Sequence, residues 1–315
     1  MKRLNVIKNQ NIFFLISVVI IAIGLLFLVF GGLNLDIQFR GGTRILIETN
    51  GEVDSNKAEE LVEKAIGKSV TAQTQKTNNP ASENEVIYML RLDIASEETL
   101  STEERDLVVD LITENFDVKE GGNQEMLSVE PSIGRETLLN GLKAVVIASV
   151  LIILYVTWRF SSMHGFAAAI TAIIALLHDV AITFALYPVF KYPLGEVFIT
   201  AALTIIGYSL NNTIVIYDRI RENIRIMKKS TLDDIVNSSI NQSLSRTINS
   251  TVTTLIAVVV LYISASISNI SSLKEFSLPL IVGLIAGTYS SLFIASPLWL
   301  IWRRKVSLNK SLKKA

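Results

Sequence analysis

The chain has 315 residues, half of them apolar, and equal numbers of acidic and basic side chains give it no net charge. This composition is typical of a membrane protein, and the balanced charge gives no indication of nucleic-acid binding. The sequence contains no cysteine and only two histidines, His164 and His178. Disulfides, thiolate metal sites, a cysteine nucleophile and a multi-histidine zinc site are therefore excluded, and we expect neither a metal centre nor a bound cofactor.

The first predicted element is an uncharged apolar run over residues 12–30. At about 1.5 Å per residue, a helix of this length crosses a bilayer. A cleaved signal peptide has a shorter apolar core and a small-residue cleavage site, so the run is interpreted as an uncleaved transmembrane helix. Residues 1–32 then form a cytoplasmic N-terminus and the first span.

Residues 33–135 have the composition of a soluble domain. Alternating patterns predict strands at 44–49, 69–75, 85–92 and 126–129, with a turn at 77–84. Helical patterns predict one helix at 54–66 and another at 97–116, the second capped by Ser96. The order βαββαβ is the ferredoxin-like arrangement of an α+β domain. Its predicted core positions include Leu61, Val62, Ile66 and Leu111.

Residues 136–305 return to an apolar composition. We expect five further transmembrane helices, at about 138–157, 165–187, 197–217, 246–264 and 276–302, with a charged amphipathic connection at 218–243. A basic tail occupies residues 306–315. The fold class is thus a polytopic α-helical membrane protein with six transmembrane helices and a ferredoxin-like domain between helices 1 and 2.

The distribution of lysine and arginine predicts the orientation. With a cytoplasmic N-terminus, fifteen basic residues lie inside, and only Lys191 and Lys274 lie in the short outside loops. The opposite topology would invert this bias. Both termini are therefore expected inside, and residues 33–135 outside the cytoplasm.

Polar side chains interrupt the fourth predicted span, where Ser209, Asn211, Asn212 and Thr213 occupy places suited to lipid-facing residues. Unpaired polar groups in hydrocarbon cost several kcal/mol each, by rough estimate, so this patch is expected to face a bundle interior or a wet cavity.

His178 and Asp179 lie well inside the third span, where an ionisable group is either functional or a structural tie between helices. The sequence leaves these two readings equally open. Adjacent side chains on a helix point about 100° apart, which argues against a Ser-His-Asp catalytic arrangement.

Arg246 begins a hydroxyl-rich stretch in which Thr247, Ser250, Thr251 and Thr254 share one helix face. Arg246 is either an interfacial anchor or part of an inner-leaflet polar site. Its depth resembles that of Asn212. We therefore expect Arg246 to face Asn211 and Asn212 across the bundle, with Asp179 as the nearest acid.

Two further motifs have simple structural interpretations, one of them incomplete. Asp218, Arg219, Arg221 and Glu222 form a charged helix exit, in which positive-inside anchoring explains the arginines but not the acids. The second motif precedes the first predicted strand and contains paired glycines that favour a turn, whereas no helix or Lys-Ser/Thr follows to make a phosphate loop. Its residues are Phe39, Gly41, Gly42 and Thr43.

The segments QFRGGT, ALLHDV, IIGYSLNNTIVIYDRIREN and INQSLSRTINSTVTTL occur in this order and resemble the SecF family of protein-export subunits. The resemblance covers nearly the whole chain and places it in the SecD/SecF group of the resistance-nodulation-division superfamily. It implies a non-enzymatic, multi-pass protein of the bacterial cytoplasmic membrane. It also implies pairing with SecD, action with SecYEG and with YajC and YidC on preprotein substrates, and use of a H⁺ or Na⁺ gradient.

The chain departs from the family pattern at three places. Asn212 stands where these proteins usually have an aspartate that exchanges the coupling ion, and an amide cannot titrate. Arg40 replaces a small hydroxyl residue, and Glu130 precedes Pro131 in place of a glycine. Two alternatives stay open: an independent ion-driven exporter of lipids or small molecules, and a purely structural translocon subunit.

Overall fold

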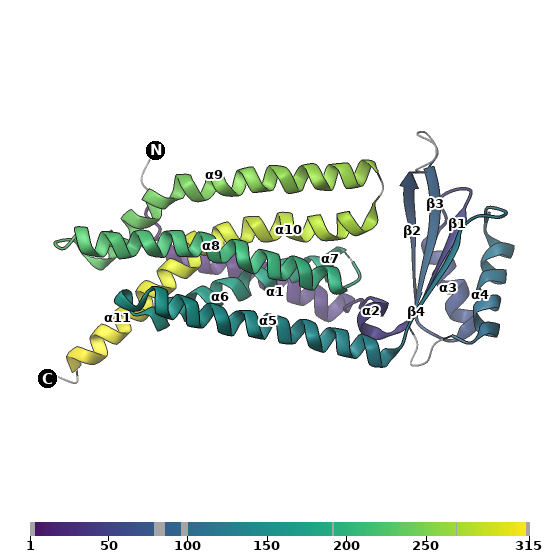
Figure 1. The fold of residues 1–315 in the computed structure, drawn as a ribbon, viewed down its shortest axis with the longest axis horizontal. Coiled ribbons are helices and arrows are strands. Elements are labelled where there is room, and N and C mark those ends of the chain that lie inside the picture. The colour runs from purple at the N-terminus through teal and green to yellow at the C-terminus, as the bar shows by residue number, and fades with distance from the viewer. Residues whose placement is uncertain (1–3, 79–85, 96–99, 191, 269, 313–315) are drawn as a thin grey trace.

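The computed structural model describes residues 4–78, 86–95, 100–190, 192–268 and 270–312. An elongated helical bundle carries a small sheet with two helices at one end (Figure 1). The beginning of α1 (Gln10–Gly31) and the helix α11 (Ser296–Leu312) lie at the opposite end of the bundle. The chain therefore crosses the bundle from end to end several times.

Six segments of the described chain are long and apolar enough to cross a membrane. Each overlaps one of the six spans predicted from sequence, which confirms their number and order. The segments are α1; α5 (Pro131–Arg159); α6 (Gly165–Phe184) with α7 (Leu186–Phe190); α8 (Glu196–Ile226); α9 (Leu232–Ile267); and α10 (Ser271–Ser290) with the π-helical turn η2 (Ser291–Ala295) and α11.

The charged connection predicted at 218–243 is largely helical, because α8 continues to Ile226 and α9 begins at Leu232. Ion pairs along α8 and a cap at the start of α9, where the Thr231 side chain accepts from the Asp234 backbone, support these extensions. The spans therefore project beyond the apolar segment at the end opposite the sheet.

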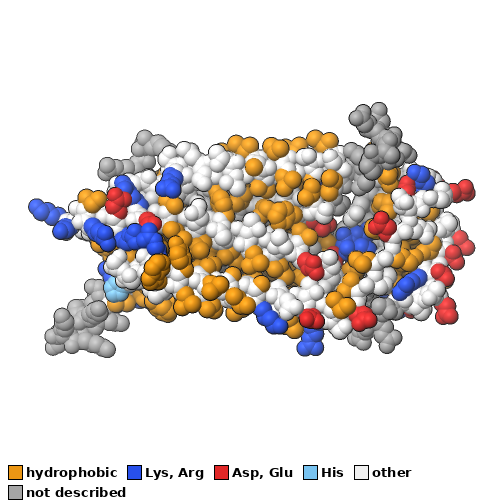
Figure 2. All heavy atoms as spheres, in the orientation of Figure 1, with side chains coloured by type: hydrophobic (Ala, Val, Ile, Leu, Met, Phe, Trp, Pro, Cys, Tyr) orange, Lys and Arg blue, Asp and Glu red, His pale blue; other side chains and the backbone are white. Residues whose placement is uncertain are grey.

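Apolar side chains dominate the middle of the bundle surface, and charged side chains gather toward its two ends (Figure 2). The outward faces of α1 and α5 carry large exposed apolar residues, among them Leu15, Val18, Leu26, Val146, Leu151 and Leu154. Such faces suit contact with lipid tails.

The sheet contains β1 (Gly42–Thr49), β2 (Val70–Asn78), β3 (Val86–Ile94) and β4 (Gln124–Val129), in the spatial order β2-β3-β1-β4 with all pairs antiparallel. Helices α3 (Ser55–Ile66) and α4 (Thr102–Asn115) follow β1 and β3. The predicted order βαββαβ is thus observed. Ile45, Ile47, Leu90, Leu92, Val62 and Ile112 form the core between the helices and one face of the sheet.

Two details of the domain differ from expectation. Helix α4 begins at Thr102 rather than at residue 97, because Ser101 and Glu104 form a reciprocal capping box. The expected cap Ser96 and the turn over 79–84 lie outside the described residues. Leu111 is only half-buried, since the buried positions of α4 are Val108 and Ile112 and Leu111 lies about 100° around the helix axis from Ile112.

This register predicts different costs for two neighbouring substitutions. Ile112→Ala leaves a cavity at a fully buried site and should destabilise the sheet domain by about 2–5 kcal/mol, whereas half-buried Leu111 should tolerate alanine with a clearly smaller loss. Thermal unfolding of the full chain, monitored by protease sensitivity of residues 33–135, measures both. Equal losses for the two variants would contradict the register of α4.

Candidate functional site

A buried carboxylate lies where three membrane helices meet. The Asp179 side chain on α6 is inaccessible to solvent. Its Oδ2 accepts hydrogen bonds from the hydroxyls of Ser209 on α8, at 2.6 Å, and Ser290 on α10, at 2.8 Å. A carboxylate among hydrocarbon requires such donors, because an unpaired one is strongly disfavoured there. The helices are therefore held around this group.

The carboxylate also connects to α1 through His178. The Nδ1 atom of His178 lies 3.0 Å from Asp179 Oδ1, and Nε2 lies 2.9 Å from the Ser17 hydroxyl oxygen. The expectation that these adjacent side chains diverge is wrong, because the imidazole folds back onto the neighbouring carboxylate. Ser17 is itself buried within an apolar span, so this chain of groups can hold or pass a proton but presents no nucleophile to solvent.

The π-helical turn η2 begins directly after the serine that contacts Asp179. Ser291 shares a 2.9 Å hydrogen bond with Thr213 and donates to the Ser209 carbonyl at 3.2 Å. Two consecutive residues, Ser290 at the end of α10 and Ser291 at the start of η2, thus bind α6 and α8 respectively. Single π-turns of this kind occur frequently at functional sites, where they alter the direction of side chains.

The structure separates the two asparagines that sequence analysis placed together. Asn212 is buried, and its Nδ2 has no hydrogen-bond partner among the described residues. Asn211 is exposed on the outward side of α8. Of the hydroxyl face on α9, Thr247 is buried and Ser250 half-buried, and Thr247 Oγ1 also lacks a described partner.

Arg246 does not lie where sequence analysis placed it. Its side chain is exposed and lines a cavity of about 540 Å³ between α8 and α9, with Asp218 and Glu222 as the acids in its wall. The hydrogen-bond partners of Asp179 are instead the hydroxyls of two serines and the imidazole of His178. Thr247, the next residue on α9, is buried. Because neighbouring residues on a helix point about 100° apart, the Arg246 side chain is directed away from the interior.

The charged helix exit forms a set of ion pairs in the same region. Arg159 at the end of α5 and Arg221 contact Asp218 at 3.0 and 2.7 Å, and Arg219 contacts Glu222 at 2.5 Å. Of the acids that positive-inside anchoring left unexplained, Asp218 therefore ties α5 to α8, and Glu222 pairs with Arg219 within α8.

The glycine motif forms the tight connection between the membrane helices and the sheet. Gly41 and Gly42 have φ values of +81° and +135°, which side chains disfavour. A Cβ on Gly41 would approach Pro131 Cα to 2.6 Å, and one on Gly42 would overlap the Ile94 carbonyl oxygen. Phe39 is buried and Thr43 shares a 3.1 Å hydrogen bond with Ser128. The motif thus brings α2 (Ile37–Arg40) against the start of α5.

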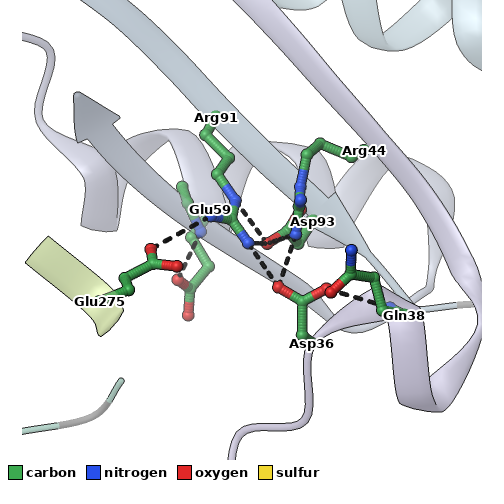
Figure 3. A network of polar contacts seen from close by, with 8 residues as sticks. Asp36, Gln38, Arg44, Glu59, Arg91, Asp93 and Glu275 are labelled. Atoms are coloured by element: carbon green, nitrogen blue, oxygen red, sulfur yellow. Dashed lines mark hydrogen bonds and ion pairs between the residues drawn. The ribbon is translucent and has the colours of Figure 1, made fainter. Parts of the chain in front are cut away.

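A network of charges that was not predicted from the sequence lies between the sheet and the bundle (Figure 3). Arg44 on β1 contacts Asp93 on β3 at 2.6 Å and Asp36, before α2, at 2.7 Å. Arg91 on β3 contacts Asp93 at 2.6 Å and Asp36 at 2.8 Å, and lies 3.7 Å from Glu275 on α10. Charges on the open face of the sheet thus reach the membrane helices.

These side chains are well removed from solvent. The Arg91 and Asp36 side chains are 6% and 9% exposed. Burial alone would lower the pKa of the Arg44 guanidinium, but its hydrogen bonds and ion pairs with Asp93 and Asp36 outweigh burial and raise that pKa. A cavity of about 380 Å³ borders the network, with Tyr187, Tyr192 and Phe198 in its wall.

One part of this network has a local sequence signal. Arg91 and Asp93 share a sheet face at positions i and i+2, whereas Arg44 opposes Asp93 only through the register of β1 against β3. Glu275 lies far away in the sequence, and although Asp36 is only eight residues before Arg44, no spacing rule connects either acid to the strands.

The fold and the buried polar centre define a multi-pass helical membrane protein with an ionisable group among its spans. Residues 109–305 match the model of the family described as protein export membrane protein SecD/SecF, C-terminal. The protein translocase subunit SecF of Alicyclobacillus acidocaldarius is 34% identical, over 99% of this chain and 96% of that protein. The chain belongs to the SecD/SecF family.

Two SecDF proteins extend this relationship. SecDF of Bacillus subtilis is 34% identical over 94% of this chain, which spans 38% of that longer protein. The crystal structure of SecDF from Thermus thermophilus, described as a translocon-associated membrane protein, superposes with a TM-score of 0.77 at 28% identity. That match covers 96% of this chain and 39% of the SecDF chain. The relatives are translocase subunits, in keeping with a transport role rather than an enzymatic one.

The junction network predicts a strong effect of removing one guanidinium. Arg91→Met leaves the buried carboxylates of Asp36 and Asp93 to share the single guanidinium of Arg44, so one negative charge is uncompensated, and the change should destabilise the sheet domain by about 3–5 kcal/mol. Lys76→Met removes an ion pair with Glu52 that is exposed, and it should leave stability nearly unchanged. Thermal unfolding of both purified variants provides the comparison. A wild-type melting temperature for Arg91→Met would show that the network contributes little.

Proposed function

We propose that this chain is an auxiliary subunit of a Sec protein-export complex, which pairs with SecD and helps to draw preproteins across the bacterial cytoplasmic membrane. Membership in the SecD/SecF family supports the export role. The relatives that contain both parts in one chain support the pairing, because this chain matches only about two fifths of them. Association with SecYEG, and with YajC and YidC, follows from the same assignment.

The outward face of α8 is the observation that carries the pairing. Its exposed residues within the span are small or polar, and they recur at helical spacing as Thr200, Thr204, Gly207 and Asn211. No large apolar side chain between residues 196 and 225 is strongly exposed in the described chain, unlike α1 and α5. A face of small and polar residues packs well against another transmembrane helix and poorly against lipid.

The arrangement of the ends supports the orientation with both termini in the cytoplasm. The sheet lies at the opposite end of the bundle from α11 and the start of α1 (Figure 1). Arginines gather at the latter end, as cytoplasmic segments require. The sheet domain, in the ferredoxin-like arrangement, then lies outside the cytoplasm, where it can contact an emerging preprotein or the corresponding SecD domain.

Asp179 is the group in this chain that we assign to coupling with a H⁺ or Na⁺ gradient. Its three hydrogen-bond partners are its neighbour His178 and a serine on each of two other helices, so a change in its charge alters the contacts that hold α6, α8 and α10 together. Asn212 cannot take this part, because its amide does not titrate. The structural-subunit alternative, favoured by that asparagine, assigns coupling wholly to SecD.

The orientation predicts the accessibility of single cysteines, which the cysteine-free chain makes simple to test. Glu120→Cys, in the sheet domain, should react with a membrane-impermeant maleimide added to spheroplasts. Lys229→Cys, between α8 and α9, should react only after the membrane is opened. Labelling of both positions in intact spheroplasts would contradict the proposed topology.

The coupling role predicts the behaviour of Asp179→Asn in inverted vesicles that also contain SecD. The amide keeps the size of the side chain but cannot change charge, so export should lose most of its stimulation by the gradient. Stimulation is measured as the ratio of export without and with an uncoupler. Asn212→Asp should be tolerated and should increase the ratio, since it supplies a second titratable group.

Asp106→Asn is the matched control, because it makes the same change on an exposed position of α4. It should leave the ratio at the wild-type value. If Asp179→Asn also does so, the structural-subunit alternative is correct for this chain.

A further inference from the structure

The cavity between α8 and α9 has an excess of positive charge. It has a volume of about 540 Å³, within the usual range of about 300–1,000 Å³ for small-molecule sites. Four arginines and two acids line it, which leaves two positive charges in excess when all are ionised. These residues are Arg219, Arg221, Arg225, Arg246, Asp218 and Glu222.

Two of the four arginines already form ion pairs and hydrogen bonds with neighbouring residues. Arg219 binds Glu222 at 2.5 Å and Gln242 at 2.6 Å. Arg221 binds Asp218 at 2.7 Å and the backbone carbonyl of Arg159 at 3.2 Å. Both acids of the cavity are therefore neutralised by these partners, and the excess charge resides elsewhere.

Arg225 and Arg246 carry that excess. Both side chains are exposed, and neither forms a hydrogen bond or an ion pair with any described residue. They come from different helices and line the same cavity. Because guanidinium groups bind phosphate oxygens through paired N–H donors, two uncommitted guanidinium groups suit an anionic phosphate ligand.

The apolar part of the wall indicates where the phosphate comes from. Val215 and Ile226 also line the cavity, and Ile226 is 67% exposed. The cavity thus combines cationic and apolar walls at the end of the apolar spans, where phospholipid headgroups would lie in the proposed orientation. Basic pockets between transmembrane helices on the cytoplasmic side are characteristic sites for anionic lipids.

We propose that this cavity binds the headgroup of an anionic phospholipid, with its phosphate held by Arg225 and Arg246 and its acyl chains against Val215 and Ile226. The assignment does not depend on the pairing with SecD, because the cavity lies within one chain. Free inorganic phosphate offers the same oxygens but has no acyl chains to bury, so it should bind far more weakly.

Titration of the purified full chain in neutral detergent with phosphatidylglycerol tests this proposal, with bound lipid counted by native mass spectrometry. Phosphatidylglycerol should bind more tightly than phosphatidylcholine. At about 1 kcal/mol per basic group near a membrane surface, Arg225→Gln with Arg246→Gln should weaken binding roughly 30-fold. Arg225→Lys with Arg246→Lys keeps both charges and should bind at an intermediate level.

The matched control is Lys228→Gln with Lys229→Gln, which removes the same charge beside the cavity from side chains outside its lining. It should keep the wild-type affinity for phosphatidylglycerol. An equal loss in this control would mean general charge attraction and would overturn the site. Binding of inorganic phosphate as tight as that of phosphatidylglycerol would overturn the lipid assignment.

Discussion

The need to satisfy a carboxylate inside hydrocarbon determines how the membrane helices are arranged. Asp179 accepts from Ser209 and Ser290 and contacts His178, which in turn contacts Ser17. These few hydrogen bonds join four spans. Between helices that face lipid there is little hydrophobic gain from association, so interhelical hydrogen bonds and close packing have a larger share in specifying the bundle.

Close packing supports the same arrangement. Gly283 lies directly against Ile205, and Gly287 lies against Ser209, where a Cβ would approach the serine Cβ to 2.8 Å. Small residues on α10 thus let α8 approach closely enough for Ser209 and Ser290 to share one carboxylate oxygen. Packing and hydrogen bonding at this point depend on each other.

The length of the apolar runs was sufficient to predict six spans, because the thickness of the bilayer fixes the length of a crossing helix. Alternation and helical periodicity similarly predicted the βαββαβ order. The polar patch was expected to face the bundle interior or a wet cavity, and Ser209, Asn212 and Thr213 are buried, whereas Asn211 is exposed. These features depend on local patterns that the sequence displays directly.

The partners of individual side chains could not be predicted in this way. Arg246 was placed by its depth, but depth does not specify which side of a helix faces inward, and the arginine lies on the outer side. The contact of Arg91 with Glu275 joins residues that are far apart in the sequence, so it depends on how the sheet docks on the bundle. Such contacts follow from tertiary structure alone.

Helix α10 joins the charge network at the sheet to the buried carboxylate of Asp179 in the bundle. Glu275 lies near its first turn, beside Arg91, and Ser290 at its end binds Asp179. Fifteen residues at 1.5 Å each separate them by roughly 22 Å. A hydrogen-bonded helix resists stretching, so α10 keeps the distance between its two ends nearly constant. Pro279, inside the helix, is a point where it can bend. An axial displacement of the sheet domain would therefore change the distance between Ser290 and the buried carboxylate of Asp179.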